Sequence, residues 1–320
     1  MSVPMVQPDD AQLAGLEEGT RSRRGTLLWR VVTHSLPATI GAIILLLFVL
    51  VAIFAPWLAP YDQHEQVGPV FGHPSTEHWL GLDDGGVDML SLLIWGARVS
   101  LVVGFSAALV AMLIGGTVGI LAGYFGGKTD TALMRITDYV LVIPDIPLML
   151  IVAAVWGRSL TNIILIIGII YWTSTARLIR AQVKSVRERV YVKRARALGA
   201  GHNRLVFRHV LPQVMPLLVA NTVLMVAVAI FAETAIAFLG LGDPSLTSWG
   251  LLIENAFDRQ AISTGAWWAV VPPGVCVTVV ILACTMLGTA IEDALNPRLS
   301  ASHLSVKRFR LRPLPAKEQG

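Results

Sequence analysis

Few residues in this chain have the types and spacing that covalent chemistry needs. Residues 126–129 (Gly-Gly-Lys-Thr) are similar to the end of a nucleotide phosphate loop. The complete phosphate-binding pattern needs a further glycine where this chain has Ala122, and a preceding strand where it has an apolar run. We therefore expect a glycine-rich turn with one basic residue at this position, and ATP bound by another chain.

Two carboxylates, Asp145 and Glu233, interrupt long apolar runs. A charge in the middle of a membrane-spanning helix costs about 2.5–3.5 kcal/mol on insertion scales, so it normally faces a cavity or a partner. Glu233 is interpreted either as a group that lines or gates a path, or as one that only fixes helix packing. The prolines on both sides of Asp145 predict a broken helix at a cavity. The alternative is a carboxylate near the inner third of the membrane that reaches water.

The histidines and cysteines lack the spacing of a metal or disulfide site. His64, His73 and His78 are spaced by nine and five residues, which is not a coordinating pattern, and we expect solvated loop residues. Cys276 and Cys284 stand eight positions apart, about 12 Å along one helix, so they cannot bridge each other. The sequence predicts a chain without catalytic residues, metal or cofactor.

Composition indicates a membrane protein. Hydrophobic residues make up 54% of the 320 positions, and the mean hydropathy is +0.65. Charged residues make up only 14%, against about 25% in a typical soluble domain. This balance excludes a disordered chain and a nucleic-acid-binding domain, and it argues against a soluble enzyme.

Six apolar runs are long enough to cross a bilayer as helices, because about 20 residues span its ~30 Å of hydrocarbon. None alternates as a membrane β-strand would. The sequence predicts an all-α fold with six transmembrane helices near residues 38–59, 99–123, 138–157, 160–178, 213–240 and 267–291.

Basic residues predict the orientation. With the N-terminus inside, 22 of the 25 Lys and Arg residues lie on the cytoplasmic side, as the positive-inside rule requires. Both termini are then cytoplasmic. The predicted organisation is a tail at 1–37, a first helix at 38–59, an extracytoplasmic loop at 60–97, a five-helix core at 98–292 and a second tail at 293–320. We expect solvated tails, with contact to anionic membrane lipid as an alternative.

The inner loop at 177–212 is the most informative segment. It carries ten basic residues and one acid, Glu188, and its apolar residues recur at helical spacing. Gly199 is placed to end one helix, and Pro212 is placed to start the next. This pattern predicts two short helices with a hinge, suited to docking in a partner's groove. A positive-inside anchor or a lipid-binding amphipathic helix are the alternatives.

This loop resembles the EAA loop of ABC-importer permeases. That pattern is Glu-Ala-Ala, three residues, Gly, and a Leu-Pro pair about eleven residues later, with His common before the pair in the peptide-importer branch. Residues 191–200 and 208–212 match its spacing through Gly199, His209, Leu211 and Pro212. The chain departs from the pattern where the glutamate and first alanine are expected, which are here Lys193 and Arg194, and only Ala195 keeps it.

Further segments resemble the C-type permease of dipeptide and oligopeptide importers, over about residues 27–300. They are residues 54–62, 78–84, 96–101, 119–130, 134–138, 233–242, 248–250 and 293–298. The resemblance implies the type I importer permease fold in a bacterial cytoplasmic (inner) membrane. It implies as partners a second homologous permease, two ATPase subunits that carry ATP and Mg, and an extracytoplasmic substrate-binding protein.

What the resemblance implies for function is a permease that does no covalent chemistry itself. Residues of the inner loop would couple it to the ATPases: Lys193, Arg194, Ala195, Gly199, His209, Leu211 and Pro212. The expected solute is a di- or oligopeptide, with nickel, glutathione or an oligosaccharide as alternatives. A stand-alone six-helix channel or secondary transporter is the rival class. It would need a pore-lining motif, a re-entrant loop or inverted repeats.

Overall fold

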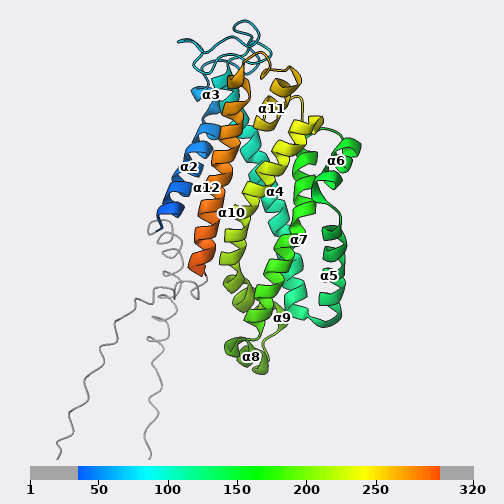
Figure 1. The fold of residues 1–320 in the computed structure, drawn as a ribbon. Coiled ribbons are helices and arrows are strands. Elements are labelled where there is room, and N and C mark those ends of the chain that lie inside the picture. The colour runs from blue at the N-terminus through cyan, green and yellow to red at the C-terminus, as the bar shows by residue number, and fades with distance from the viewer. Residues whose placement is uncertain (1–34, 296–320) are drawn as a thin grey trace, which may run out of the picture.

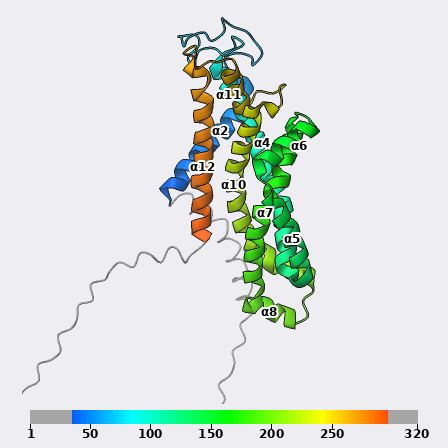
Figure 2. The same cartoon turned by 45° about the vertical axis from the view of Figure 1, so that its right-hand side comes forward.

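The computed structural model describes residues 35–295, and every regular element within that range is a helix. Long helices run side by side, as Figures 1 and 2 show. The loop at 59–88 lies at one end of this bundle, called here the loop end. Helices α8 (Val190–Ala197) and α9 (His202–Leu205) lie at the other, called the α8 end. Most of both predicted tails lies outside the described residues.

The predicted six-span, all-α fold is confirmed as five long apolar helices and one bent pair. The five are α2 (Leu36–Ile53), α4 (Met89–Phe125), α7 (Leu160–Arg187), the continuous stretch His202–Leu241 and the stretch Trp267–Leu295. The fourth comprises α9, a π-helical turn η1 (Val206–Val210), α10 (Leu211–Ile236) and η2 (Ala237–Leu241); the fifth comprises η3 (Trp267–Ala269) and α12 (Val271–Leu295). Short helices α3 (Ala55–Leu58) and α11 (Trp249–Asp258) complete the set.

The third span, predicted near 138–157 with a break at Asp145, is divided into two helices. It is a pair, α5 (Gly127–Val142) and α6 (Asp145–Trp156), bent by 86°. Ile143 and Pro144 between them have extended backbone, with ψ of 128° and 127°. A residue before proline is pushed out of the helical region, so the chain turns here. The predicted break at Asp145 is confirmed, and this residue begins α6.

Three other predicted boundaries move. Helix α4 begins at Met89 rather than near 99, because the Asp88 carboxylate caps it by accepting a hydrogen bond from the Ser91 amide at 2.9 Å. Residues 89–97 of the predicted extracytoplasmic loop at 60–97 are therefore helical. Helix α7 continues to Arg187, nine residues beyond the predicted end of its span. The predicted first helix at 38–59 breaks at Phe54, before the short α3.

Helices α4 and α7 approach closely along a stripe of glycines. At Gly119 an added Cβ would lie 2.7 Å from the Ala176 carbonyl oxygen, and at Gly123 it would lie 2.8 Å from the Arg180 carbonyl oxygen. Only glycine permits this distance between two backbones, as is common where helices pack inside membranes. The stripe holds α7 beside α4 down to the α8 end.

Pro212 lies in the first turn of α10, as predicted, but no gap separates this turn from the helical residues before it. The helix already begins at His202 and runs through Pro212 without interruption. The π-turn η1 precedes the proline, and the Leu211 amide donates to the carbonyl of Val206, five residues back. Because proline has no N–H to continue the α-helical ladder, this wider turn lets the helix pass the proline.

Candidate functional site

The candidate coupling segment is a short helix closed by a glycine. After α8, the Gly199 amide donates to the Arg196 carbonyl at 3.0 Å, and the Ala200 amide donates to the Ala195 carbonyl at 3.1 Å. These two bonds form a Schellman cap, which requires a left-handed residue. Gly199 has φ of +83°, so the prediction that it ends the helix is confirmed.

One face of α8 is anchored to the bundle. Val192 is fully buried, in an apolar cluster with Val183 and Val186 of α7 and Val210 and Val214 of the following helix. The apolar residues that recur at helical spacing in the inner loop, from Val183 to Leu198, do not lie on one continuous helix. Helix α7 ends at Arg187 and the chain turns at Glu188 and Arg189, so Val190 becomes exposed.

Tyr124, near the C-terminus of α4, is contacted by one residue each from α7, α8 and α9. Its carbonyl oxygen accepts from Arg187 Nη1 at 3.0 Å, and its hydroxyl lies 3.0 Å from His202 Nδ1. The Arg196 guanidinium lies over its ring, 5.9 Å from the centroid. The sequence analysis missed this residue, because nothing local marks a tyrosine at a helix end as a contact for a segment about 70 positions away.

The other face of α8 is open and carries basic and apolar side chains together. Lys193 and Arg194 are exposed, and Leu198 has 88% of its surface exposed. Lys193 Nζ lies 2.9 Å from a Glu188 carboxylate oxygen, and this hydrogen bond holds the pKa of Glu188 below its ordinary value. Val190 and Tyr191 are exposed as well, so α8 presents apolar and basic side chains together.

The other predicted coupling residues are divided between this tip and the helix behind it. Ala195 is half-buried and packs against the apolar cluster under α8. The His209 ring contacts Tyr191 of α8, with centroids 6.3 Å apart. Leu211 and Pro212 are half-buried at the start of α10, directly after the π-turn that contains His209. The structure therefore brings Lys193, Arg194 and Gly199 to the exposed tip and His209 into contact with α8, while Leu211 and Pro212 lie in α10.

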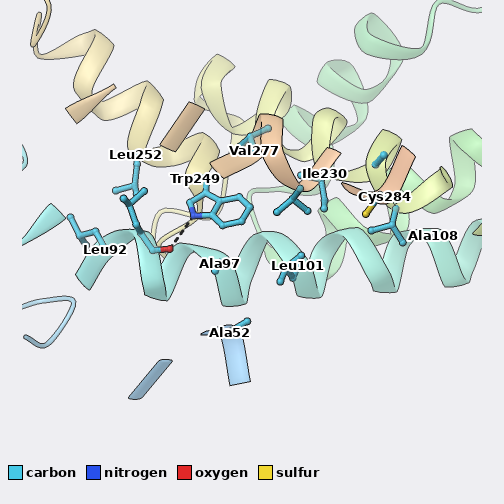
Figure 3. Packing of buried hydrophobic residues seen from close by; sticks show 14 of the residues in the cluster. Ala52, Leu92, Ala97, Leu101, Ala108, Ile230, Trp249, Leu252, Val277 and Cys284 are labelled. Atoms are coloured by element: carbon cyan, nitrogen blue, oxygen red, sulfur yellow. Dashed lines mark hydrogen bonds between the residues drawn. The ribbon is translucent and has the colours of Figure 1, made fainter. Parts of the chain in front are cut away.

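Glu233 is buried inside the bundle. It lies on α10 with 3% of its surface exposed, and its Oε2 accepts a hydrogen bond from the Ser100 hydroxyl of α4 at 3.3 Å. The same hydroxyl accepts from the Trp249 amide at 3.3 Å, in the first turn of α11. Trp249 is itself fully buried, and its Nε1 donates to the Leu93 carbonyl at 3.0 Å, as Figure 3 shows. Glu233 therefore lies where α4, α10 and α11 meet.

Asp145 differs from Glu233 in its environment, because the Asp145 side chain is exposed and the Glu233 side chain is buried. Asp145 accepts a hydrogen bond from the Tyr171 hydroxyl of α7 at 3.0 Å and one from the Ile146 amide at 2.9 Å. The two carboxylates have different partners and no hydrogen bond or ion pair joins them within residues 35–295. The structure gives each its own environment rather than one shared site.

Comparison with known proteins identifies the family. A model of the binding-protein-dependent transport system inner membrane component matches residues 115–301, and a model of the N-terminal TM domain of oligopeptide transport permease C matches residues 25–71. The chain belongs to this family of inner-membrane transport permeases.

Curated relatives agree with this placement. The dipeptide transport system permease protein DppC of Alkalihalophilus pseudofirmus is 37% identical, over 82% of this chain and 86% of its own length. The di/tripeptide permease protein DppC of Pseudomonas aeruginosa is 36% identical, over 85% and 91%. The glutathione permease protein GsiD of Pectobacterium atrosepticum is 32% identical, also over 85% and 91%. The resemblance to a dipeptide or oligopeptide ABC permease is confirmed.

The permease also carries a charge cluster that the sequence analysis missed. Asp130, in the first turn of α5, is bound by Arg180 and by Lys184 of α7, whose Nζ lies 2.6 Å from its Oδ2. Arg180 and Lys184 are four positions apart and so share one helix face. The sequence offered one signal for this cluster: two basic residues four positions apart in one apolar helix, and an aspartate shortly after the glycine turn at 126–127. The cluster joins α5, the first helix of the bent pair, to the part of α7 that precedes α8.

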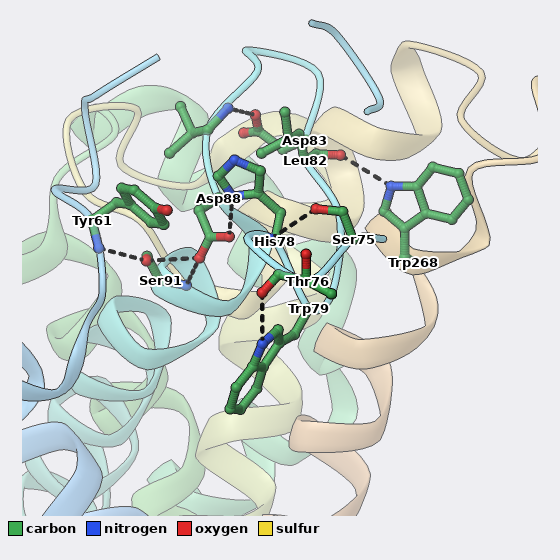
Figure 4. A network of polar contacts seen from close by, with 11 residues as sticks. Tyr61, Ser75, Thr76, His78, Trp79, Leu82, Asp83, Asp88, Ser91 and Trp268 are labelled. Carbon is green, nitrogen blue, oxygen red and sulfur yellow. Dashed lines mark hydrogen bonds and ion pairs between the residues drawn. The ribbon is translucent and has the colours of Figure 1, made fainter. Parts of the chain in front are cut away.

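At the loop end of the permease, Asp88 organises a polar network (Figure 4). His78 Nδ1 lies 3.0 Å from Asp88 Oδ1, and the Ser91 hydroxyl donates to Asp88 Oδ2 at 2.8 Å. The Tyr61 amide in turn donates to the Ser91 hydroxyl. His78 is therefore not the solvated loop residue that was expected. Trp268 donates from Nε1 to the Leu82 carbonyl at 3.1 Å, which fixes the loop to the start of α12.

Proposed function

We propose that this permease is the membrane subunit of an ATP-driven importer for di- or oligopeptides, and that α8 couples it to an ATPase. The observation that carries the proposal is the open tip of α8, with Lys193, Arg194 and Leu198 exposed on a helix whose other face is anchored. The names of the relatives from Alkalihalophilus pseudofirmus and Pseudomonas aeruginosa support the peptide class.

The coupling route that we propose runs along the bundle. The stretch His202–Leu241 has 40 residues, about 60 Å of helix, so it reaches from the coupling segment to Glu233 and the loop end. A displacement of α8 is transmitted through Val192 and His209 to this helix. At its far end, the contact of Glu233 with Ser100 responds to the same movement, together with α11. Rigid-body movement of packed helices is a common form of such switching.

Orientation in the membrane follows from the distribution of basic residues. The α8 end is cytoplasmic, which the ten basic residues at 177–212 support, and both termini then lie inside. A second homologous permease completes the translocation path. Two ATPase subunits bind ATP and Mg below, and an extracytoplasmic substrate-binding protein delivers the solute to the loop end. The residues of this chain then carry out no covalent step.

The solute is decided by transport measurements on the assembled importer. Subunits that co-purify with the tagged permease are identified and reconstituted in proteoliposomes, and uptake of labelled dipeptide, tripeptide, hexapeptide and glutathione is compared. ATP-dependent uptake of a peptide, with ATP hydrolysis lost on deleting residues 190–198, supports the proposal. Preferential uptake of glutathione would place this chain with the function named for GsiD. Isolation of the chain as a homo-oligomer without an ATPase would favour the channel or secondary-transporter class instead.

A further inference from the structure

A groove of about 400 Å³ lies between α2 and α4 near the loop end. Its α2 wall is apolar, from Val49, Ala52 and Ile53. Its α4 wall carries Leu101, Val102 and Phe105, with Arg98 and Ser106 as the polar residues. The α4 residues recur at three and four positions, so they form one continuous stripe along the helix.

Arg98 is the only charged residue in this lining, and it has no acidic partner within residues 35–295. Arg158 and Arg259, the other two residues outside the 22 Lys and Arg residues assigned to the cytoplasmic side, differ from it. Arg259 lies 3.7 Å from the Asp84 carboxylate, and Arg158 acts electrostatically on Glu254. An exposed guanidinium beside apolar side chains is suited to bind an anion through charge-assisted hydrogen bonds.

The groove opens to the outside of the helix bundle. Helix α2 has no charged residue, and only Ala38, Gly41 and Ala52 of its 18 residues are buried. Val102 and Phe105 at the groove are exposed by 44% and 41%. Hydrocarbon is the natural neighbour of an apolar helix face that the chain itself leaves uncovered.

Arg98 lies in the first part of α4, close to an exposed tryptophan of α3. It is nine residues into α4, about 14 Å along the helix, and beside the last residue of α2. Trp57, four residues beyond α2, has 78% of its surface exposed. Exposed tryptophans of membrane proteins concentrate at the headgroup level, so the polar boundary of the bilayer lies close to Arg98.

We propose that this groove binds one phospholipid from the leaflet at the loop end, with its phosphate on Arg98 and an acyl chain along Leu101, Val102 and Phe105. The planar guanidinium can donate two parallel hydrogen bonds to phosphate oxygens. The apolar lining then holds the chain below the headgroup. The bound lipid fills the space between α2 and the core helix α4.

The test uses the full chain purified in mild detergent, titrated with phosphatidylglycerol and examined by native mass spectrometry. We expect one tightly held lipid per chain. Arg98→Gln should weaken its binding about tenfold, because a charge-assisted pair is lost. Val102→Trp leaves Arg98 in place but fills the groove, and it should abolish binding. The matched control is Arg259→Gln, a loop-end cation outside the groove, which should bind the lipid as the unchanged chain does.

A photo-crosslinking residue placed at Phe105 in the membrane-embedded importer identifies the occupant directly. A lipid adduct that is lost with Arg98→Gln supports the site. An adduct to the second permease would overturn it, because the groove would then be a subunit interface. Equal lipid retention by Arg98→Gln, Val102→Trp and the unchanged chain would also overturn it.

Discussion

The hydroxyl of Ser100 on α4 donates a hydrogen bond to the buried carboxylate of Glu233 on α10, across 133 positions of sequence. The same Ser100 oxygen accepts the amide of Trp249, so one side chain joins three helices. A carboxylate in a membrane-embedded bundle is expensive, and this one is retained at a junction of helices rather than on an exposed surface.

Glu233→Gln should leave the fold and the assembly intact, because the amide keeps an oxygen that accepts from Ser100. We expect uptake by the reconstituted importer to fall several-fold, since the carboxylate charge is lost. Uptake and subunit recovery are measured on the same preparation. Ser100→Ala is the companion variant, which keeps the carboxylate and removes both hydrogen bonds of the Ser100 hydroxyl, each worth about 1 kcal/mol. Normal uptake by Glu233→Gln would reduce Glu233 to a packing role.

Gly199→Ala should uncouple the importer. Its φ of +83° costs a residue with a Cβ about 1–2 kcal/mol, although no neighbouring atom obstructs the added carbon. We expect normal membrane insertion and a loss of substrate-stimulated ATP hydrolysis. Gly201→Ala is the matched control, since Gly201 has φ of −66° and equally open surroundings. The coupling assignment is contradicted if both variants hydrolyse ATP at the same rate.

Asp130→Ala should destabilise the permease by about 2 kcal/mol, because it leaves Arg180 and Lys184 partly buried without their partner. Asp138→Ala removes an exposed ion pair with Arg177 on the same two helices, and its cost should stay below about 0.5 kcal/mol. Denaturation midpoints in one detergent compare the two variants. Equal midpoints would mean that the Asp130 cluster adds nothing beyond a surface pair.

Asp243 should give a pH-dependent contribution to stability. Burial alone would raise its pKa, but hydrogen bonds from Ser245 and from the Leu160 amide outweigh burial and hold the pKa below 3.8. The folded state therefore binds a proton less readily than the unfolded chain. This stabilisation is present above about pH 4 and is lost as the pH falls below that value.

Asp243→Asn tests the sign of this effect. Thermal denaturation from pH 6 to pH 3 should show a difference between unchanged and variant chains that is constant above pH 4.5 and shrinks below it. A difference that grows on acidification would contradict the assignment. The loop at 242–248 and the start of α7 are the parts expected to loosen first.

Sequence alone determined the features that depend on local pattern. Apolar runs of about 20 residues predicted the spans, and the prolines beside Asp145 predicted a break that the structure contains. Gly199 after a helical repeat predicted the end of α8. Each of these depends on residues within one or two helical turns, where backbone geometry and hydrophobicity act directly.

Tertiary structure alone decided which distant residues meet. How the helices cross decides three features: the pairing of Ser100 with Glu233, the three contacts on Tyr124 and the ion pairs of α7 with Asp130. Local sequence also did not predict the size of the bend between α5 and α6, which is 86°, or the continuity of the long helix from η1 into the turn that contains Pro212. A hydrophobic period shows that a helix face is buried, but the neighbour of that face is decided by packing across the whole bundle.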